Sequence, residues 1–356
     1  MKSYGDLYYK FLSRENILLA IKNASKRKKK RKYVRMIIEN PEQYVDYFRN
    51  YAMKFKNKKH KPREIYDGIQ RKKRIIIVPT FDEQVVHHML VNVLKPILLK
   101  PMYMHSYGSL PNKGSYKGMK TIKKWIKYGG KNIKYCFKCD IKKYFDSIPH
   151  DILKSKLRKI IKDEMFLNVL FEVIDVVPKG IPLGFYTSQW LSNWYLTELD
   201  HKIKEEFGAI YYIRYMDDIV MFGSNKRKLH KLKEKVERYI NDKLGLVLKE
   251  NWQIFRFDYG NRKGRPLDFM GYKFYRNRIT LRKTILKKAK RKAFNIYWKN
   301  KITIFDARQM LSYMGWFSHT NTYKTYLNDI KPYVNIQYLK RKISYYDRRF
   351  EKIQVA

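Results

Sequence analysis

Two adjacent aspartates, Asp217 and Asp218, stand in the middle of an otherwise apolar segment, residues 211–222. The pattern Tyr-Tyr-Ile-Arg-Tyr-Met-Asp-Asp-Ile-Val-Met-Phe predicts two short strands around a tight turn that carries both carboxylates. Adjacent like charges on a hydrophobic hairpin are costly unless something compensates them. Mg²⁺ does this well, because it prefers a few carboxylates together with substrate phosphates. Asp-Asp alone is common in surface turns, so the apolar flanks are what favour a cation site.

A third aspartate, Asp140, ends another apolar stretch, within Phe-Lys-Cys-Asp-Ile-Lys-Lys-Tyr-Phe-Asp-Ser-Ile at residues 137–148. A carboxylate there could share metal ions with Asp217 and Asp218. Two ions roughly 3.5–4 Å apart clamp the attacking and leaving oxygens of an in-line phosphoryl transfer. Two alternatives stay open. Asp140 could simply cap the strand end, and Asp146 competes with it, although Asp146 falls in the following turn, where aspartate often caps a helix.

Hydrophobic periodicity predicts the elements that must position these aspartates. Asp140 lies in a strand expected over residues 135–141. Helices are expected over residues 13–35, 82–99, 151–161, 187–206 and 226–244, and short strands over residues 267–275 and 278–281. From residue 282 onward the chain is helical, basic and aromatic, so the fold class is mixed α and β.

The charge restricts the partners. The chain has 356 residues, with 79 Lys and Arg against 32 Asp and Glu, and a formal charge of +47. Such a chain repels itself and needs a polyanion, for which nucleic acid is the first candidate and an anionic membrane surface the alternative. The basic run 24–32 is dense enough to favour phosphate contacts. No apolar run approaches a membrane span and no signal peptide begins the sequence, so a soluble, cytoplasmic protein is expected.

The two cysteines, Cys136 and Cys139, form a lone C-x-x-C inside an apolar, strand-like run. A zinc site would need two more ligands nearby, and a redox motif would sit at the start of a helix. Two reduced core or half-buried thiols are therefore expected. His87 and His88 are expected to pack or to face solvent, because no acidic partner lies at metal-binding spacing.

Taken together, these segments resemble reverse transcriptases. Residues 137–148 resemble motif A, and Tyr-Met-Asp-Asp at residues 215–218 resembles motif C. Gly-Ile-Pro-Leu-Gly-Phe-Tyr-Thr-Ser-Gln at residues 180–189 is similar to motif B, residues 245–249 to motif D and residues 267–272 to motif E, the primer grip. All five stand in family order between about residues 71 and 275.

The resemblance implies an α+β right-hand polymerase with an antiparallel palm sheet and a helical thumb. It places the fingers and the N-terminal basic region at residues 1–130. The palm would cover residues 131–275, with a fingers insertion at about residues 150–190, and the thumb residues 276–356.

The resemblance also implies residue roles. Asp140 matches the first metal-binding aspartate and Asp217 the essential hairpin aspartate, with Asp218 beside it; together they would hold two Mg²⁺ ions, or Mn²⁺. Phe145 matches the steric gate, a ring that would collide with a ribose 2′-hydroxyl and so select deoxynucleotides. Phe145 as ordinary core stays open, because Tyr144 is adjacent.

Three further residues would bind the nucleotide. Gln189 matches the motif B glutamine that lines the pocket, and Arg74 resembles a fingers residue that contacts the incoming triphosphate. Either of the lysines at positions 72 and 73 could do the same work. Lys249 is the candidate general acid of motif D, but it follows Leu248 directly and Trp252 occupies the later slot where relatives often place the lysine.

The region after residue 275 resembles a thumb. Its Trp298 and Trp316 could stack on bases or pack, and packing is favoured. We see no segment that resembles an RNase H, an HNH endonuclease or an integrase. The residues expected to track the phosphates of an RNA–DNA hybrid are Arg282, Lys283, Lys287, Lys288 and Arg291.

The Gly-x-x-x-Ser-Gln form of motif B resembles that of diversity-generating retroelements and of antiphage-defence enzymes more than that of retrons or group II introns. Either setting implies a structured non-coding RNA as template, with a DNA or RNA primer and dNTPs. A diversity-generating retroelement also implies a small basic accessory protein. Two alternatives remain: a non-catalytic RNA-binding protein on a polymerase scaffold, and template-independent or protein-primed DNA synthesis by the same site.

Overall fold

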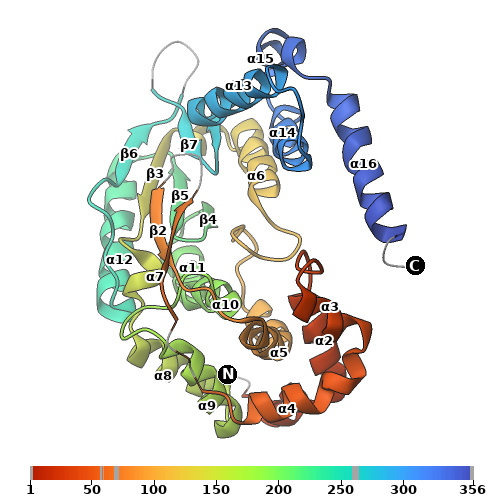
Figure 1. The fold of residues 1–356 in the computed structure, drawn as a ribbon. Helices are drawn as coiled ribbons and strands as arrows, with labels where there is room; N and C mark the ends of the chain where they lie inside the picture. Colours follow the sequence, from red (N-terminus) through yellow and green to blue (C-terminus); the bar gives the residue numbers. More distant parts are fainter. Residues whose placement is uncertain (1–2, 57, 59, 68–71, 259–263, 353–356) are drawn as a thin grey trace. The chain divides into compact units, whose positions relative to one another are not determined.

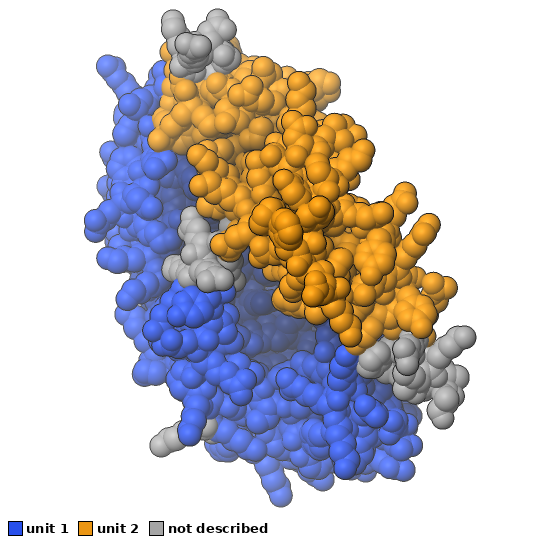
Figure 2. Space-filling model, turned by 45° about the horizontal axis from the view of Figure 1, so that its top comes forward, with its two compact units in different colours: residues 1–66, 73–118, 135–254 blue, residues 67–72, 119–134, 255–356 orange. Residues whose placement is uncertain are grey.

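The structure, a computed structural model, describes residues 3–56, 58, 60–67, 72–258 and 264–352. The chain forms two compact units, shown in different colours in Figure 2. Unit 1 contains residues 1–66, 73–118 and 135–254, and unit 2 contains residues 67–72, 119–134 and 255–356. Among the described residues, no helix is long and apolar enough to cross a membrane.

The sheet of unit 1 carries the acidic hairpin (Figure 1). Its strand order is β4-β5-β3-β6, with β4 at Tyr211–Tyr215, β5 at Asp218–Gly223, β3 at Tyr135–Asp140 and β6 at Gln253–Arg256. Strands β3 and β4 both pair antiparallel with β5. The inner residues of β5 are all buried, which agrees with its continuous apolar sequence. Both cysteines on β3 are buried free thiols, as expected.

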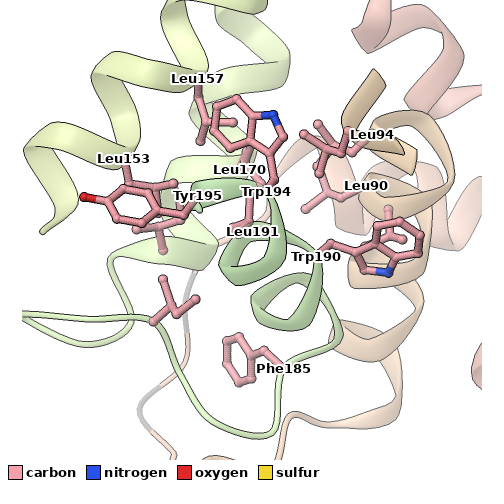
Figure 3. Close-up of a cluster of buried hydrophobic side chains, with 14 of the residues drawn as sticks. Leu90, Leu94, Leu153, Leu157, Leu170, Phe185, Trp190, Leu191, Trp194 and Tyr195 are labelled. Atoms are coloured by element: carbon pink, nitrogen blue, oxygen red, sulfur yellow. The ribbon is translucent and has the colours of Figure 1, made fainter. Parts of the chain in front are cut away.

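Helix α5 (Phe81–Leu99) is the centre of the helical part of unit 1. It packs against α1 (Leu7–Leu12), α2 (Arg14–Ala24), α4 (Val45–Met53) and α10 (Tyr186–Tyr195). Figure 3 shows how α10 is held: its Trp190, Leu191, Trp194 and Tyr195 lie among leucines of α5, α8 (His150–Ile160) and α9 (Glu164–Ile174). All of these side chains are buried, so α10 is fixed on several sides.

Two long helices expected from the sequence are divided. The helix predicted over residues 13–35 becomes α2 and α3 (Lys32–Glu39), with a left-handed residue, Arg27, between them. Residues 26–32 are consecutive cations with no apolar side chain to bury, so like-charge repulsion opposes a continuous helix there. The helix predicted over residues 187–206 becomes α10, α11 (Thr197–His201) and the π-helix η3 (Lys202–Glu206). At that break, the Thr197 hydroxyl donates to the Asn193 carbonyl, a bond that bends helices.

Unit 2 contains a small antiparallel sheet, β7 (Leu267–Phe269), β8 (Tyr272–Phe274) and β9 (Ile279–Leu281), which agrees with the predicted strands. Helix α14 (Ile304–Phe317) packs against α13 (Lys283–Tyr297) and α16 (Ile336–Lys352). The other elements of the described chain are η1 (Pro41–Tyr44), β1 (Arg63–Asp67), β2 (Lys72–Ile76), α6 (Ser115–Tyr128), η2 (Gly130–Ile133), α7 (Tyr144–Ser147), α12 (Lys226–Leu244), α15 (Tyr323–Asp329) and η4 (Lys331–Tyr333).

Candidate active site

The structure brings the three predicted aspartates together at one end of the unit 1 sheet. Asp140, the last residue of β3, lies directly opposite Asp218, the first residue of β5. Tyr215 pairs with the same Asp218 from the other side, which leaves Met216 and Asp217 as the turn of the hairpin. All three carboxylates are half-buried. The β3–β5 register therefore makes one acidic cluster from residues far apart in the sequence.

The turn that presents Asp217 is strained. Met216 has φ 57°, in the left-handed region that a side chain disfavours by about 1–2 kcal/mol. A positive φ at the first central residue suits a two-residue hairpin, where glycine is the usual occupant. Methionine persists there because its surroundings hold it: the Arg214 guanidinium donates to the Met216 carbonyl at 2.9 Å, and the Asn193 amide lies 3.3 Å from the Met216 sulfur.

Arg214 is the residue that the sequence analysis missed. Its side chain is fully buried and forms an ion pair with Asp200 of α11, with Nη2 2.6 Å and Nε 2.8 Å from the carboxylate oxygens. The Tyr212 hydroxyl donates to the same carboxylate. An arginine inside an apolar strand was a usable signal, because a buried charge requires a buried partner. The ion pair fixes α11 to β4 directly beside the acidic turn.

Gly108 closes the turn from another segment of unit 1. A Cβ added at Gly108 would lie 2.5 Å from Met216 Cγ and 2.6 Å from its backbone nitrogen. The Gly108 carbonyl accepts a hydrogen bond from the Asn193 amide at 2.9 Å. Only a residue without a side chain allows the backbone to approach this closely.

The electrostatics of the cluster favour a bound cation. Burial, together with the charges of Asp140 and Asp217, raises the pKa of Asp218 to about 7, although Lys138 opposes the shift. Burial and Asp140 also raise the pKa of Asp217, against Lys249 and Arg74. The Asp218 Oδ1 atom is buried without a hydrogen-bond donor. The Lys138 ammonium lies 3.7 Å from this atom.

These oxygens suit a hard cation such as Mg²⁺, which would supply the positive charge that the cluster lacks. The residues fit Mg²⁺ by the chemical type of their oxygen atoms and not by a preformed geometry. Within the described part of the chain, no three acidic, His or Cys side chains converge into a metal cage. Mg²⁺ commonly takes only one or two carboxylates and completes its shell with water and phosphate oxygens.

The motif B-like segment, residues 180–189, contacts the elements that carry two predicted nucleotide-binding residues, Phe145 and Arg74. A Cβ on Gly180 would lie 2.5 Å from the Phe145 carbonyl oxygen, and the Ile181 amide donates to that oxygen at 2.8 Å. A Cβ on Gly184 would overlap the carbonyl of Ile77, which follows β2. The turn thus fixes α7, which carries Phe145, next to β2, which carries Arg74.

Side-chain exposure separates the residues of this group. Tyr144 is buried and its hydroxyl donates to the Ser192 carbonyl, so Tyr144 is the core residue. Phe145 is only half-buried, and Gln189 on α10 is exposed. Arg74 is half-buried on β2. The side chains of Phe145, Gln189 and Arg74 are therefore not fully buried, so a nucleotide could reach them and their predicted roles stay predictions.

Lys249 lies beside the first aspartate. Its ammonium is 3.2 Å from Asp140 Oδ2, and its backbone amide donates to the Asp140 carbonyl at 2.8 Å. Leu248 pairs with Ile141, so the motif D-like segment continues the sheet next to the carboxylates. The direct Leu-Lys sequence, a departure from the family pattern, thus still places the lysine at the cluster.

Comparisons with known proteins agree with this geometry. The family model described as reverse transcriptase (RNA-dependent DNA polymerase) matches residues 46–274, more than half of the chain. The chain belongs to the reverse transcriptase family. The matched range contains every predicted metal-binding and nucleotide-binding residue.

Three relatives of this reverse transcriptase chain come from Escherichia coli and Lactococcus lactis. Protein YkfC of Escherichia coli K12 is 26% identical over 147 residues, covering 38% of this chain and 39% of YkfC. The group II intron-encoded protein LtrA of Lactococcus lactis is 22% identical over 274 residues, covering 57% of this chain and 44% of LtrA. The retron Ec73 reverse transcriptase of E. coli is 26% identical over 166 residues, covering 43% of this chain and 50% of the retron enzyme. The match thus spans half or less of each relative.

A solved structure confirms the fold. The apo telomerase of Candida tropicalis superposes with a TM-score of 0.50 at 14% sequence identity, covering 80% of this chain and 58% of that one. The predicted α+β right-hand polymerase architecture, with an antiparallel palm sheet, is therefore confirmed.

Unit 2 holds the residues predicted to contact phosphates. Lys283, Lys287 and Arg291 are exposed on α13, and Lys288 is half-buried. Arg282 precedes the helix and forms an ion pair with Asp268 at 2.5 Å, so its charge is already compensated within the protein.

A surface cavity of about 760 Å³ lies away from the acidic cluster, among α8, α11, η3 and α12 of unit 1. Its wall mixes lysines such as Lys156 and Lys243 with acidic residues such as Glu198, and Lys156 pairs with Glu198. None of the predicted site residues lines this cavity.

Proposed function

We propose that this chain is an RNA-directed DNA polymerase that adds dNTPs to a primer 3′-hydroxyl by two-metal phosphoryl transfer. One observation carries the proposal: Asp140 lies opposite Asp218 in the sheet, next to Asp217, and the pKa of both hairpin aspartates is raised by burial and by the charge of Asp140. Lys249 and Lys138 compensate the three carboxylates only in part, because the pKa of Asp217 and of Asp218 stays raised. Such a cluster is maintained at a cost in stability, which a cation-dependent reaction would explain.

Asp140, Asp217 and Asp218 would hold the ions, two Mg²⁺ or Mn²⁺. When bound, such ions stabilise charge on the phosphoryl oxygens and lower the pKa of the attacking hydroxyl. Arg74 would neutralise the triphosphate. Lys249, whose ammonium lies 3.2 Å from Asp140, would deliver a proton to the leaving phosphate.

Two residues would set nucleotide selection. The half-buried ring of Phe145 would exclude a 2′-hydroxyl, because its backbone is fixed by the Gly180 turn. The exposed Gln189 would border the base of the incoming nucleotide. Together they would select deoxynucleotides over ribonucleotides, so that the product is DNA.

The domain assignment follows the same proposal. Residues 1–130 would form the fingers and the N-terminal basic region, residues 131–275 the palm with an insertion at about 150–190, and residues 276–356 the thumb. On α13 of the thumb, Lys283, Lys287, Lys288 and Arg291 would contact the phosphates of the hybrid. The charge of +47 suits a long contact with RNA.

The biological setting is part of the proposal. Two relatives are named for retroelements, a retron and a group II intron. The motif B form of residues 184–189 favours a diversity-generating or antiviral-defence system, with a structured RNA as template and a small basic accessory protein. Purification of the native complex, followed by sequencing of its RNA and mass spectrometry of its proteins, tests this setting.

Primer extension on an RNA template tests the activity. The wild-type protein should extend a DNA primer with Mg²⁺ and dNTPs, and Asp217→Ala should abolish product. Asp242→Ala, at an exposed position on α12, is the matched control and should keep full activity. A folded Asp217→Ala variant that still synthesised DNA would refute the assignment. RNA binding without any synthesis, even with the co-purifying RNA, would favour the RNA-binding alternative, which rests on the charge alone.

A further inference from the structure

Unit 2 carries a cluster of four aromatic side chains, Phe294, Tyr297, Trp298 and Tyr333, here called the aromatic cluster. The first three are exposed and Tyr333 is half-buried. Three lie at the C-terminal end of α13 and Tyr333 lies on η4. Trp298 is 69% exposed, Tyr297 56% and Phe294 48%. Single exposed aromatic residues are ordinary, but a contiguous group of this size commonly marks an interaction surface.

The rings hold one another in place. Phe294 contacts Trp298 at 6.1 Å and Tyr333 at 5.7 Å between ring centroids, and Tyr297 contacts Trp298 at 5.3 Å and Tyr333 at 5.6 Å. Each ring thus touches two others edge to face, with interplanar angles of 64–89°. A ring fixed in this way loses little conformational freedom when a ligand stacks on it.

The core does not need these rings. The face of α13 that packs into unit 2 consists of small and aliphatic residues, Ile285, Ala289, Ala293 and Ile296, all buried. Trp316 shows the contrast, because its ring lies 4.9 Å from Tyr272 within the unit. The structure therefore separates the two tryptophans that the sequence treated alike: Trp316 packs, and Trp298 faces outward.

The charge around the aromatic cluster indicates what covers it. Phe294 and Trp298 continue a stripe of exposed cations, Lys287 and Arg291, because steps of four, three and four residues stay on one helix face. Between residues 283 and 334 the chain has eleven Lys and Arg but only two acidic residues. Both of these are paired with lysines, Asp306 with Lys292 and Lys299 and Asp329 with Lys290.

We propose that the aromatic cluster binds unpaired bases of single-stranded RNA, while the cations of the same stripe contact the phosphates. Cations beside exposed rings match the two chemical parts of a nucleotide strand, since every base has a face that can stack. A cationic ligand is disfavoured by the same lysines. The choice of RNA over DNA rests on the proposed function, whereas the stacking surface itself does not depend on catalysis.

Binding of short RNA to the full chain, without metal or dNTPs, tests the surface. The probes are an oligouridine and an abasic ribose-phosphate oligomer of equal length, titrated at several salt concentrations. Trp298→Ala should weaken oligouridine binding by about 5- to 100-fold, the range for loss of one stacked base. Affinity for the abasic oligomer and the salt slope should not change, because no phosphate contact is removed.

Two variants make the result specific. Trp298→Phe keeps a ring and should restore most of the lost affinity, and Tyr345→Ala, an equally exposed aromatic residue on α16, should bind as wild type. An equal loss for both probes, or no loss for oligouridine, would overturn the proposal; the second result would favour a protein partner. Tighter binding of oligodeoxyuridine would overturn the choice of RNA.

The outcome is separable from that of the polymerase proposal. Trp298→Ala should still extend a short annealed primer–template, because the aromatic cluster is not placed in the reaction. Repeating the binding with Asp217→Ala should give the wild-type pattern. If Trp298→Ala weakened binding of the oligouridine alone, but the wild-type protein never synthesised DNA, the base-stacking proposal would be supported and the polymerase proposal refuted.

Discussion

The guanidinium of Arg214 and the carboxylate of Asp200 form an ion pair at 2.6 Å, and neither side chain is exposed to solvent. The same guanidinium reaches the carbonyl of Met216, the residue before Asp217. A buried ion pair is weak evidence for stability, because desolvation offsets much of the attraction. Its value here is positional: it ties the acidic turn to α11, which is a separate element of the chain.

Breaking this pair should therefore affect stability and activity in different ways. Arg214→Ala should lower the free energy of unfolding by about 3–5 kcal/mol, because Asp200 is left buried and uncompensated. The double variant Asp200→Leu, Arg214→Met removes both charges and should recover most of that loss. It should still synthesise DNA poorly, since the bond to the Met216 carbonyl is gone. Denaturant melts and primer extension measure the two effects, and a double variant with full activity would remove the positioning role.

Replacing Asp218 by asparagine should stabilise the protein without divalent metal. The folded pKa of about 7 lies above the ordinary value of 3.8, so between these values the native state binds the proton that the unfolded state releases. Wild-type stability should accordingly fall as pH rises through this window, and Asp218→Asn should lack that part of the fall. At pH 8 in a chelating buffer the variant should be more stable by about 1–3 kcal/mol.

Adding Mg²⁺ should narrow the difference in the free energy of unfolding between Asp218→Asn and the wild type, because the ion stabilises only the intact carboxylate cluster. Thermal unfolding at several pH values, with and without Mg²⁺, gives the measurement. The exposed Asp242→Asn variant should follow the wild type throughout. An Asp218→Asn variant less stable than wild type at pH 8 would show that the carboxylate is already compensated within the fold.

Gly108→Ala should damage the site from a distance in sequence. The new methyl would lie 2.5 Å from Met216 Cγ and 2.6 Å from its backbone nitrogen, so the turn or the residue 107–108 segment must move. We expect a loss of about 1–3 kcal/mol in the free energy of unfolding and a marked fall in polymerisation rate. Gly315→Ala in α14 is the control: its Cβ would meet nothing within 4 Å, and it should stabilise by about 0.5–1 kcal/mol. Equal activity of the two variants would contradict the close packing at Met216.

Phe145 and Tyr144 should behave differently when changed. Phe145→Ala should admit ribonucleotides while leaving the fold intact, because the ring is half-buried at the surface of α7. Tyr144→Phe should leave sugar selection unchanged and cost about 1 kcal/mol, the worth of its hydrogen bond to the Ser192 carbonyl. The ratio of rNTP to dNTP incorporation is the readout. A greater ribonucleotide gain for Tyr144→Phe would move the gate to the neighbouring ring.

Part of this protein is determined by its sequence alone. Helix α12 begins and ends where the periodicity of residues 226–244 predicts, and the apolar segment 211–222 folds as the hairpin with Asp217 at its turn. Both depend on local interactions: side-chain spacing along a helix face, and an apolar strand on each side of a short polar turn. Asp140 at the end of a strand follows for the same reason.

The rest depends on partners that local sequence does not specify. Asp140 faces Asp218 because of a register between strands 78 positions apart, and a shift by one residue would turn Asp218 to the other face. Burial of Arg214 required Asp200 on a separate helix, and the choice of Tyr144 over Phe145 as core required the Ser192 carbonyl. Trp316 packs against Tyr272 of the unit 2 sheet, whereas Trp298 is exposed, although the sequence favours packing for both. Hydrophobic periodicity predicts that a face will be covered, and only the tertiary structure decides by which residues.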